Sequence, residues 1–411
     1  MLSVFACSPE IGSEPGVGWR WALELSRRHD VTVLTHHHFR AHIEPRLAAE
    51  PVPGLTVSYF KVPWLNGPMH VELNSRRHYW IWQACLRLHV KRLLRAQPHD
   101  LIHHLTWGTY RFPCFLGGLG VPLALGPVGG GEGAPARMYR SWPWRERLFY
   151  AARQVSIMLS RWDPFVLWTM SSARCVLAKT RQTRDALPWF ARARAVLASE
   201  IGVAQVAPPR GRDGASVRPL RLLYAGRLLG GKGVPYVLAM MVELAARGVP
   251  AALDIAGSGR LAGWAAERVG ALGLTAQVRL HGQVPRDTLE SLYDASDLLV
   301  FPSWHDSSGN VVTEALARGL PVLCLDRGGP AEAVDAQCAL IVPTEGLDED
   351  EIARALADRV QSVAGNRERL ARLGAAATRR AHELSWRAQV RRAYDAIEPR
   401  LGWPATAWDS E

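Results

Sequence analysis

The feature that most constrains the fold of this chain is an alternation of strand-like and helical segments that runs twice. The first series begins with the apolar Leu2–Cys7, a glycine-rich loop, the helical stretch Trp19–Arg28 and the β-branched Val31–Thr35. A second series starts at Leu220–Ala225, after the segment Ala207–Pro219, which is dense in Pro, Gly and charge. Repeated strand–helix–strand units with right-handed crossovers predict two doubly wound α/β domains, each built on a parallel sheet.

The length of 411 residues is enough for two separate cores. We expect a basic N-terminal domain over 1–206, a linker over 207–219, a second domain over 220–384, and a C-terminal helix in 385–411 that returns to the first domain. In doubly wound sheets, ligands bind outside the carboxyl ends of the strands. We therefore expect a ligand site where the carboxyl ends of the two sheets face each other.

Basic residues are concentrated in the first half of the chain. Residues 1–200 contain 25 Lys and Arg against 13 Asp and Glu, whereas residues 201–411 contain 24 against 25. Nearly all of the basic residues are Arg, which a GC-rich genome would produce without any functional demand. Codon bias does not explain why the excess lies in one half.

The segment Arg137–Arg184 combines ten basic and two acidic residues with four tryptophans, Trp142, Trp144, Trp162 and Trp168. Aromatic side chains among arginines suit the headgroup layer of an anionic membrane or a polyanionic acceptor. The alternative is an amphipathic helix that packs on the sheet and exposes its Arg face to water. No recognisable nucleic-acid-binding module accompanies the charge, so we expect no nucleic acid partner.

The six cysteines are widely spread, without a C-x-x-C pair, which fits a reducing compartment rather than a disulfide framework or a zinc site. Leu2–Cys7 lacks the basic start and long apolar core of a signal peptide. No apolar run reaches the roughly 18 residues needed to span a bilayer. We expect a cytoplasmic protein, with peripheral contact at the inner face of the membrane through Arg137–Arg184.

The strongest motif lies in Phe301–Glu332, where a strand ends in the polar loop Ser303–Gly309 and a helix follows. The free N–H groups of the first helical turn can bind an anion. Asp306 lies in the loop and Glu314 follows eight residues later, so two carboxylates could accept hydrogen bonds from hydroxyls on two parts of one elongated ligand. The alternative is that Asp306 caps the helix and Glu314 lies on a solvated face.

A second motif supplies cations after the strand Leu220–Ala225. Arg227 and Lys232 lie in a glycine-rich loop, and fixed positive charge there could neutralise a departing diphosphate as its charge develops. A metal could do the same, but the one D-E-D run, Asp348–Asp350, opens a C-terminal helix and is typical of helix-start acids. We therefore expect no metal.

These segments resemble the retaining glycosyltransferases of family 4, which have the GT-B fold of two Rossmann-like domains. The resemblance is carried in the second half by PSWHDSSGNVVTEALARGLPVLCLDRGGPAE, LLYAGRLLGGKG, LDIAGSG and VRLHGQV. In the first half, GSEPGVGWRWALEL, HHLTWGTYRFP and GPVGGGE resemble a bacterial surface-glycan branch of that family. Where the family usually has Glu as the first acid, this chain has Asp306.

The resemblance implies a nucleotide-sugar donor held by the second domain. Arg227 and Lys232 would bind the diphosphate, Asp306 the sugar and Glu314 the ribose. The full set of expected donor-binding residues is Gly226, Arg227, Lys232, Gly257, Val284, Asp306, Ser308, Gly309, Asn310, Val311 and Glu314. No cofactor is expected besides this UDP- or GDP-linked substrate.

The first domain would hold the acceptor or the transferred sugar through two glycine loops. Their expected residues are Gly12, Ser13, Glu14, Gly16, Gly129 and Gly130. The family often places a functional His near the strand that starts at Asp100. Alternation along a strand lets only one of His103 and His104 face a ligand, and we favour His104, which joins Asp306, Arg227 and Lys232 as the expected catalytic set. His36–His38 is expected to be structural or near the acceptor rather than a metal site.

The function that this resemblance implies is retaining transfer of a hexose to a lipid-linked or saccharide acceptor, in exopolysaccharide- or lipopolysaccharide-type biosynthesis. A nucleotide-sugar epimerase or hydrolase of the same fold is the main alternative. A basic scaffold on membranes or nucleic acid would explain the charge but would leave the motifs at Gly226–Gly233 and Ser303–Glu314 without a purpose.

Overall fold

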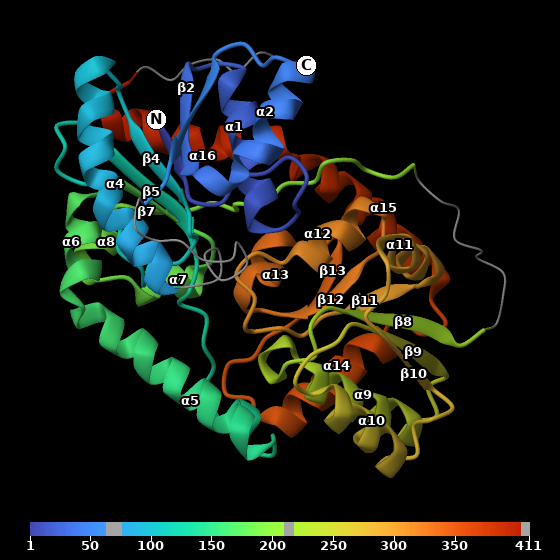
Figure 1. Cartoon of the computed structure of the whole chain (residues 1–411). Coiled ribbons are helices and arrows are strands. Elements are labelled where there is room, and N and C mark those ends of the chain that lie inside the picture. The colour runs from blue at the N-terminus through green and yellow to red at the C-terminus, as the bar shows by residue number, and fades with distance from the viewer. Residues whose placement is uncertain (63–75, 209–217, 404–411) are drawn as a thin grey trace. The chain divides into compact units, whose positions relative to one another are not determined.

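The computed structural model describes residues 1–62, 76–208 and 218–403 (Figure 1). The contacts divide the chain into two units. Unit 1 consists of Met1–Gly131, Ser156–Gly202 and the segment that begins at Trp386, and unit 2 consists of Glu132–Val155 and Val203–Ser385. The segment Glu132–Val155 was expected in the first domain, and its place in unit 2 corrects that boundary.

Unit 1 contains a seven-stranded sheet in the order β3-β2-β1-β4-β5-β6-β7, and every strand pair is parallel. The strands are β1 (Leu2–Val4), β2 (Val31–His36), β3 (Leu55–Phe60), β4 (Ile102–Thr106), β5 (Leu123–Val128), β6 (Cys175–Ala178) and β7 (Ala195–Leu197). Leu2 pairs with Val33 on one side and His103 on the other, so the direction of winding reverses between β1 and β4.

The helices of unit 1 are α1 (Glu14–Ser26), α2 (Arg40–Ala49), α4 (Arg76–Ala96), α6 (Pro164–Ser172), α7 (Arg181–Ala186), α8 (Trp189–Arg192) and α16 (Trp386–Leu401). The described part of unit 1 also contains the short helices η1 (His37–Phe39) and η3 (Ser160–Trp162). Helix α1 starts five residues before the expected Trp19, because Pro15 occupies its first turn, where the missing N–H costs no hydrogen bond.

Unit 2 contains a six-stranded parallel sheet in the order β10-β9-β8-β11-β12-β13. The strands are β8 (Leu220–Ala225), β9 (Ala251–Ala256), β10 (Val278–Gly282), β11 (Leu298–Val300), β12 (Val322–Leu325) and β13 (Ala339–Val342). Winding reverses between β8 and β11, and such a reversal opens a crevice at the carboxyl ends of the two strands.

The helices of unit 2 are η2 (Ala136–Tyr139), η4 (Gly230–Lys232), α9 (Val234–Ala246), α10 (Ala262–Ala271), α11 (Arg286–Ala295), α12 (Asn310–Ala317), α13 (Gly328–Ala333), α14 (Glu349–Gln361) and α15 (Arg367–Glu383). Helices α9, α10 and α14 lie on one side of the strands, and α11, α12 and α13 lie on the other (Figure 1). Helix α5 (Trp144–Leu159) begins in unit 2 and ends in unit 1.

The segment Glu132–Val155 belongs to unit 2 because its aromatic side chains are part of that core. Met138, Trp142 and Tyr150 are buried in the same hydrophobic cluster as β8 and α9, and the Tyr236 hydroxyl donates to the Met138 carbonyl. Two doubly wound α/β units are therefore confirmed. Among the helices of the described ranges, none has the length and hydropathy of a membrane span.

Candidate active site

Lys232 and Asp306 meet at the carboxyl ends of β8 and β11. Lys232 ends η4, eight residues after Tyr224 in β8, and Asp306 lies in the loop between β11 and α12. The Lys232 Nζ lies 2.5 Å from Asp306 Oδ2. Asp306 Oδ1 accepts hydrogen bonds from the backbone N–H groups of Ser308 (3.1 Å) and Gly309 (3.0 Å).

These contacts keep Asp306 ionised. Burial by itself would raise the pKa of its carboxyl, but the Lys232 cation and the Ser308 and Gly309 amides hold the pKa below its ordinary value. Asp306 therefore serves both as an anion beside Lys232 and as a cap for the turn before α12. The two interpretations of Asp306, binding of a sugar hydroxyl and capping of the turn, therefore do not exclude each other.

Glycines shape the loops around this pair. Gly226 and Gly257 have positive φ (137° and 145°), and a Cβ on Gly257 would lie 1.9 Å from the Gly226 carbonyl oxygen. Gly233, also at positive φ (89°), would place a Cβ 2.4 Å from the Pro302 oxygen. Gly257 and Gly233 lie so close to another backbone segment that a side chain has no room, and only glycine fits at these two positions. Val284, by contrast, packs on the unit 2 core.

The start of α12 is built against a second glycine turn. Gly309 is its N-cap residue with φ 75°, and the Gly329 N–H donates to the Asp306 carbonyl at 2.6 Å. A Cβ on Gly328 would lie 2.7 Å from the same carbonyl oxygen. Asn310 is exposed and Val311 half-buried, so the first turn of α12 lies next to Asp306 and reaches the surface.

Glu314 and Arg227 are exposed on unit 2. The Tyr293 hydroxyl donates to Glu314 Oε2 at 2.9 Å. Partial loss of water raises the pKa of the Glu314 carboxyl, although Tyr293 and the Arg286 cation act in the opposite direction. The Arg227 guanidinium is open to a ligand, while the Tyr224 hydroxyl holds the Arg227 carbonyl at 3.2 Å.

His305 is a residue that sequence reasoning missed. It directly precedes Asp306, its N–H donates to the Gly231 carbonyl at 3.0 Å, and its ring centroid lies 5.4 Å from that of Tyr150. Burial, followed by the Arg153 and Lys232 cations, lowers the pKa of His305 to about 2. The ring is therefore neutral at physiological pH. Its position next to Asp306 was the one available sequence signal.

In unit 1, the two expected glycine loops meet at Gly108, beyond the carboxyl end of β4. The Gly108 N–H donates to Glu14 Oε1 at 3.0 Å, and its carbonyl accepts from the Gly129 N–H at 2.8 Å. Gly130 has φ 104°, and its Cβ would meet Thr109 Oγ1 at 2.4 Å. The structure thus brings Glu14, Gly129 and Gly130 to one place.

The N-terminal part of the first loop, residues 12–16, makes fewer close backbone contacts than the residues around Gly108. Among the described residues, Ser13 is the one non-glycine residue with positive φ (60°). Among the described residues, a Cβ on Gly12 would meet nothing within 4 Å, whereas a Cβ on Gly16 would lie 3.0 Å from the Ile11 oxygen. Packing against the described part of the chain therefore does not require glycine at position 12, and Gly16 is tightly packed.

Replacing Glu14 by Gln should remove a pH-dependent part of the stability of unit 1. Burial first, and then the Glu200 carboxylate, raise the pKa of Glu14 from 4.5 to about 7. A carboxyl with a raised folded-state pKa favours folding when it is protonated, so its contribution is complete below pH about 4.5 and is lost as pH rises through about 7.

Chemical denaturation from pH 4 to pH 8 checks this expectation. The free energy of unfolding of the wild type minus that of Glu14→Gln should fall as pH rises and then level off. The side-chain amide introduced by Glu14→Gln would keep an acceptor for the Gly108 N–H. The difference in stability between the two proteins therefore reports the ionisation of Glu14 and not the loss of that hydrogen bond. Parallel stability profiles of the two proteins would contradict the expectation.

His103 and His104 do not fit the role expected of them. His104 is buried, with Nδ1 3.1 Å from the Ser3 hydroxyl and Nε2 2.9 Å from the Tyr79 hydroxyl. His103 is also buried, between Tyr394 Oη (3.3 Å) and the Gly126 carbonyl (2.7 Å). Burial lowers the pKa of His103 to about 4 and that of His104 to about 3. Alternation does send them to opposite faces, but each face is covered, and we withdraw His104 from the catalytic set.

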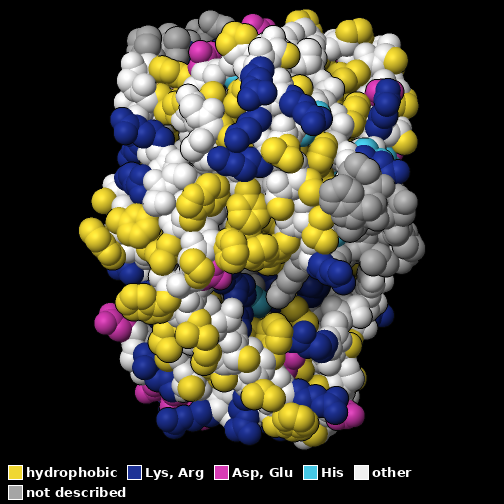
Figure 2. All heavy atoms as spheres, turned by 60° about the vertical axis from the view of Figure 1, so that its left-hand side comes forward, with side chains coloured by type: hydrophobic (Ala, Val, Ile, Leu, Met, Phe, Trp, Pro, Cys, Tyr) yellow, Lys and Arg dark blue, Asp and Glu magenta, His cyan; other side chains and the backbone are white. Residues whose placement is uncertain are grey.

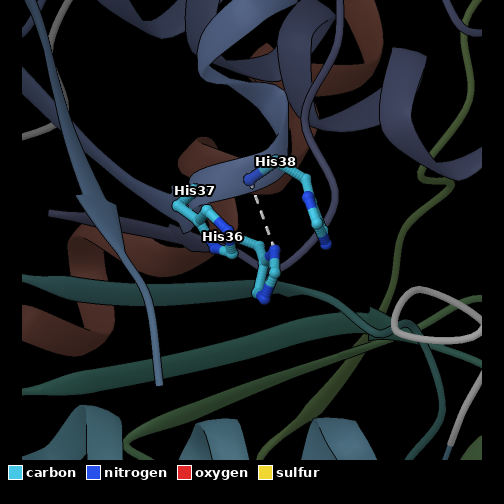
Figure 3. Close-up of side chains that lie close together, drawn as sticks. All are labelled: His36, His37 and His38. Atoms are coloured by element: carbon cyan, nitrogen blue, oxygen red, sulfur yellow. Dashed lines mark hydrogen bonds between the residues drawn. The ribbon is translucent and has the colours of Figure 1, made fainter. Parts of the chain in front are cut away.

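The three rings of His36–His38 pack together after β2, with centroids 4.4–4.7 Å apart (Figure 3). Their ring nitrogens lie within 4.8 Å of one another, so the set could hold a transition metal. Both nitrogens of His36 already have partners. Nδ1 accepts from the His38 N–H at 3.4 Å, and Nε2 lies 3.2 Å from His78 Nε2. This bonding favours the structural interpretation.

The run Asp348–Asp350 is confirmed as a helix start. Asp348 caps α14 and forms a capping box with Glu351.

Comparison with known proteins identifies a family model and several curated relatives. Residues 211–380 match the family model described as Glycosyl transferases group 1. An alpha-D-kanosaminyltransferase from Streptomyces kanamyceticus is 30% identical over 135 residues, which cover 33% of this chain and 35% of that protein. A D-inositol 3-phosphate glycosyltransferase from Rhodococcus jostii is 32% identical over 188 residues, which cover 44% of this chain and 40% of that protein. The chain matches less than half the length of these curated relatives.

Solved structures resemble the chain over nearly its whole length. Sucrose-phosphate synthase from Thermosynechococcus elongatus has a TM-score of 0.60 at 18% identity and covers 98% of both chains. Anabaena HepE in complex with UDP and glucose has a TM-score of 0.57 at 14% identity and covers 97% of this chain and 100% of its own. WaaG, a glycosyltransferase involved in lipopolysaccharide biosynthesis, has a TM-score of 0.53 at 17% identity, with coverage of 96% and 98%. At these identities the likeness concerns the fold, and it confirms GT-B. Residues 211–380 therefore match the family model of the group 1 glycosyltransferases, and the chain has the GT-B fold.

Proposed function

We propose that this protein is a retaining, metal-independent hexosyltransferase that uses a nucleotide-diphosphate sugar. The observation that carries the proposal is the Lys232–Asp306 pair at the winding reversal of the unit 2 sheet, 2.5 Å apart and next to the start of α12. A cation, helix amides and a carboxylate converge there, which is what a sugar diphosphate requires. The match to the group 1 glycosyltransferase model and the glycosyltransferases among the curated relatives support the same activity.

The proposed reaction breaks the bond between the anomeric carbon and the diphosphate and forms a bond from that carbon to an acceptor oxygen. The acceptor hydroxyl loses its proton to the departing phosphate, so the reaction consumes no other reagent. Negative charge grows on the leaving diphosphate, and Lys232, Arg227 and the first turn of α12 meet it with fixed positive potential. Retention by attack on the leaving-group face rests on the resemblance to family 4.

Each acid has a separate assignment. Glu314, exposed beside Tyr293, would accept hydrogen bonds from the ribose hydroxyls. Asp306 would accept a hydrogen bond from a hydroxyl of the sugar. Lys232, which contacts Asp306 in the structure, would then also contact the diphosphate. Asp has a shorter side chain than the Glu usual in the family, so we assign to this position a role in selecting the donor sugar.

The solved structure of HepE with UDP and glucose, and the lipopolysaccharide role of WaaG, support a UDP-hexose donor and a glycan or lipid-linked acceptor. We assign the acceptor to the unit 1 loops at Glu14 and Gly129–Gly130. A nucleotide-sugar epimerase or hydrolase remains the second candidate, because the donor site alone would serve either of them.

Incubation with UDP- and GDP-hexoses, with and without a lipid-linked saccharide, tests the proposal. A transferase should form product only with acceptor and should hydrolyse the donor slowly without it. Rapid, complete conversion to epimer or free sugar without acceptor would replace the proposal by the second candidate. Nuclear magnetic resonance of the anomeric proton in the product tests retention, and full activity in EDTA tests metal independence.

We further propose that unit 1 contacts an anionic membrane. Large apolar side chains are exposed at the end of α5 and along η3, α6 and α8, where Trp162 is 80% and Trp189 82% exposed. Figure 2 shows hydrophobic side chains gathered on one face with Lys and Arg among them. The exposed large apolar side chains at the end of α5 and on η3, α6 and α8 are Met158, Leu159, Trp162, Phe165, Trp168 and Trp189. Both acids of Arg137–Arg184 are engaged within the protein, because Glu146 is buried beside Arg260 and Asp163 caps α6.

An apolar surface with cations and few acids suits the interface of a bilayer that carries negative lipids. Replacing Trp162 and Trp189 together by Ala should weaken binding to phosphatidylglycerol vesicles at least about tenfold, since each indole loses its apolar contact with the headgroup layer. Vesicle sedimentation measures the loss, with neutral phosphatidylcholine vesicles as the control for charge. Equal binding of both proteins to both vesicle types would contradict a membrane role.

A further inference from the structure

Helix α5 reaches the Lys232 loop from a part of the chain that precedes the unit 2 sheet by more than sixty residues. The Glu146 Oε2 accepts from the Gly230 N–H at 3.0 Å, and the Tyr150 hydroxyl accepts from the Gly231 N–H at 2.8 Å. Glu146 Oε1 is held in turn by Arg260 Nε at 2.8 Å. Two consecutive peptide groups before Lys232 are thus bonded to one face of α5.

The Gly231 peptide also connects α5 to the loop of Asp306. Its carbonyl oxygen accepts from Ser303 Oγ (3.2 Å), the Trp304 N–H (3.1 Å) and the His305 N–H (3.0 Å). Tyr150 therefore bonds the N–H of Gly231, while the carbonyl of Gly231 bonds the three residues before Asp306. Gly231 also directly precedes Lys232, so this one glycine connects Tyr150 to both Lys232 and Asp306.

The glycine pair in this loop is explained by α5. A Cβ on Gly230 would lie 2.5 Å from the Trp142 ring, and a Cβ on Gly231 would lie 2.7 Å from the Tyr150 hydroxyl. Trp304 packs on both aromatics, with its ring centroid 4.7 Å from Tyr150 and 6.0 Å from Trp142. The glycines are needed for close packing against α5, which the sequence alone did not indicate.

We propose that Tyr150 and Glu146 are positioning residues for donor binding: they hold the Gly230–Lys232 turn so that Lys232 faces Asp306 and the donor diphosphate. This inference rests on the proposed function. Neither residue need touch the substrate, because both act through the backbone of the turn. A turn with unsatisfied Gly230 and Gly231 amides would sample other conformations, and Lys232 would meet the diphosphate in only a fraction of them.

Tyr150→Phe is the sharpest variant, since it keeps the ring and its packing and removes only the acceptor of the Gly231 N–H. The nucleoside diphosphate, UDP or GDP, that binds the wild type more tightly serves as the probe in calorimetry. We expect its Kd to rise about 5- to 30-fold, in proportion to the cost of one unsatisfied buried amide. The donor KM should rise more than kcat falls, and amide hydrogen exchange at residues 230–232 should accelerate without ligand.

Two controls separate positioning from general stability. Tyr139→Phe alters the same aromatic cluster, since Tyr139 lies 5.8 Å from Trp142 and 6.0 Å from Trp304, but its hydroxyl makes no hydrogen bond among the described residues. It should leave Kd and exchange unchanged. Glu146→Gln keeps an oxygen for Gly230 and should bind nucleotide more tightly than Glu146→Ala.

The experiment distinguishes failure of the positioning role of Tyr150 from failure of the proposed donor site at Lys232. If Tyr150→Phe binds the probe as tightly as the wild type while Lys232→Ala does not, the positioning role is overturned and the donor site stands. If neither variant loses affinity, the donor site and the positioning role fall together. Unchanged exchange at Gly231 in Tyr150→Phe would overturn the positioning role even without a ligand.

Discussion

Lys232→Ala is expected to lower the affinity for the nucleotide donor about 10- to 150-fold and to reduce the rate of transfer at least as much. The reason is that a charge-assisted hydrogen bond to a phosphate contributes about 1.5–3 kcal/mol, and about 2.7 kcal/mol corresponds to about 100-fold in affinity. Arg227 and the first turn of α12 remain in the variant, so residual weak binding is expected rather than none. Isothermal calorimetry with UDP and GDP measures the change.

The same change affects stability, and the experiment must separate the two effects. The side chains of Lys232 and Asp306 are 13% and 14% exposed, so removing the lysine leaves a largely buried carboxylate without its cation. Breaking such a pair costs about 3–5 kcal/mol. The double variant Lys232→Ala/Asp306→Asn should recover stability but not donor affinity. Lys91→Ala, an exposed lysine on α4, is the control with the same chemical change and no expected effect on either property.

A contradictory result is easy to recognise. If the double variant regains both stability and donor affinity, Lys232 contributes to binding only by keeping the loop folded. The assignment of Lys232 to the diphosphate would then be wrong.

Gly257→Ala should destabilise unit 2 by more than about 4 kcal/mol, the largest stability effect that we expect from a single methyl group. The new Cβ would lie 1.9 Å from the Gly226 carbonyl oxygen, and Gly257 has φ 145°, a region that L-residues rarely adopt. Neither cost can be relieved by rotating a side chain, because the obstacle is backbone. The turns after β8 and β9 would have to separate.

Gly270→Ala is the matched control for this prediction. Gly270 lies inside α10, and a Cβ there would meet none of the described residues within 4 Å. Alanine in a helix is favoured over glycine by about 0.5–1 kcal/mol, so Gly270→Ala should be neutral or stabilising. Urea denaturation of the two variants gives the comparison. Similar stabilities for Gly257→Ala and the wild type would show that the turn has another conformation open to it.

The fold could be predicted from the sequence because its signals are local. Each strand of a parallel sheet is an apolar run, each crossover helix follows within a few residues, and the linker interrupts the series at Ala207–Pro219. The division of the chain could not be predicted in the same way. Glu132–Val155 follows a Gly- and Pro-rich stretch, but that composition does not show to which unit the segment belongs. Only the packing of Trp142 and Tyr150 into the unit 2 core assigns it to that unit.

The site was partly predictable for the same reason. Asp306 and Lys232 each follow a strand, but they are 74 residues apart, and their pairing depends on β8 and β11 being neighbours in the sheet. Alternation along β4 correctly separates His103 from His104, yet it cannot show that Tyr79 and Ser3 cover one face and Tyr394 the other. Burial of a strand residue by segments that are distant in the sequence cannot be predicted from the local sequence pattern.

A crystal structure of the protein with a bound UDP- or GDP-hexose tests the central claim most directly. The diphosphate is expected between Lys232 Nζ and the first turn of α12, with a ribose hydroxyl bound to Glu314 and a sugar hydroxyl bound to Asp306. A nucleotide sugar bound elsewhere, with Lys232 still paired only with Asp306, would contradict it.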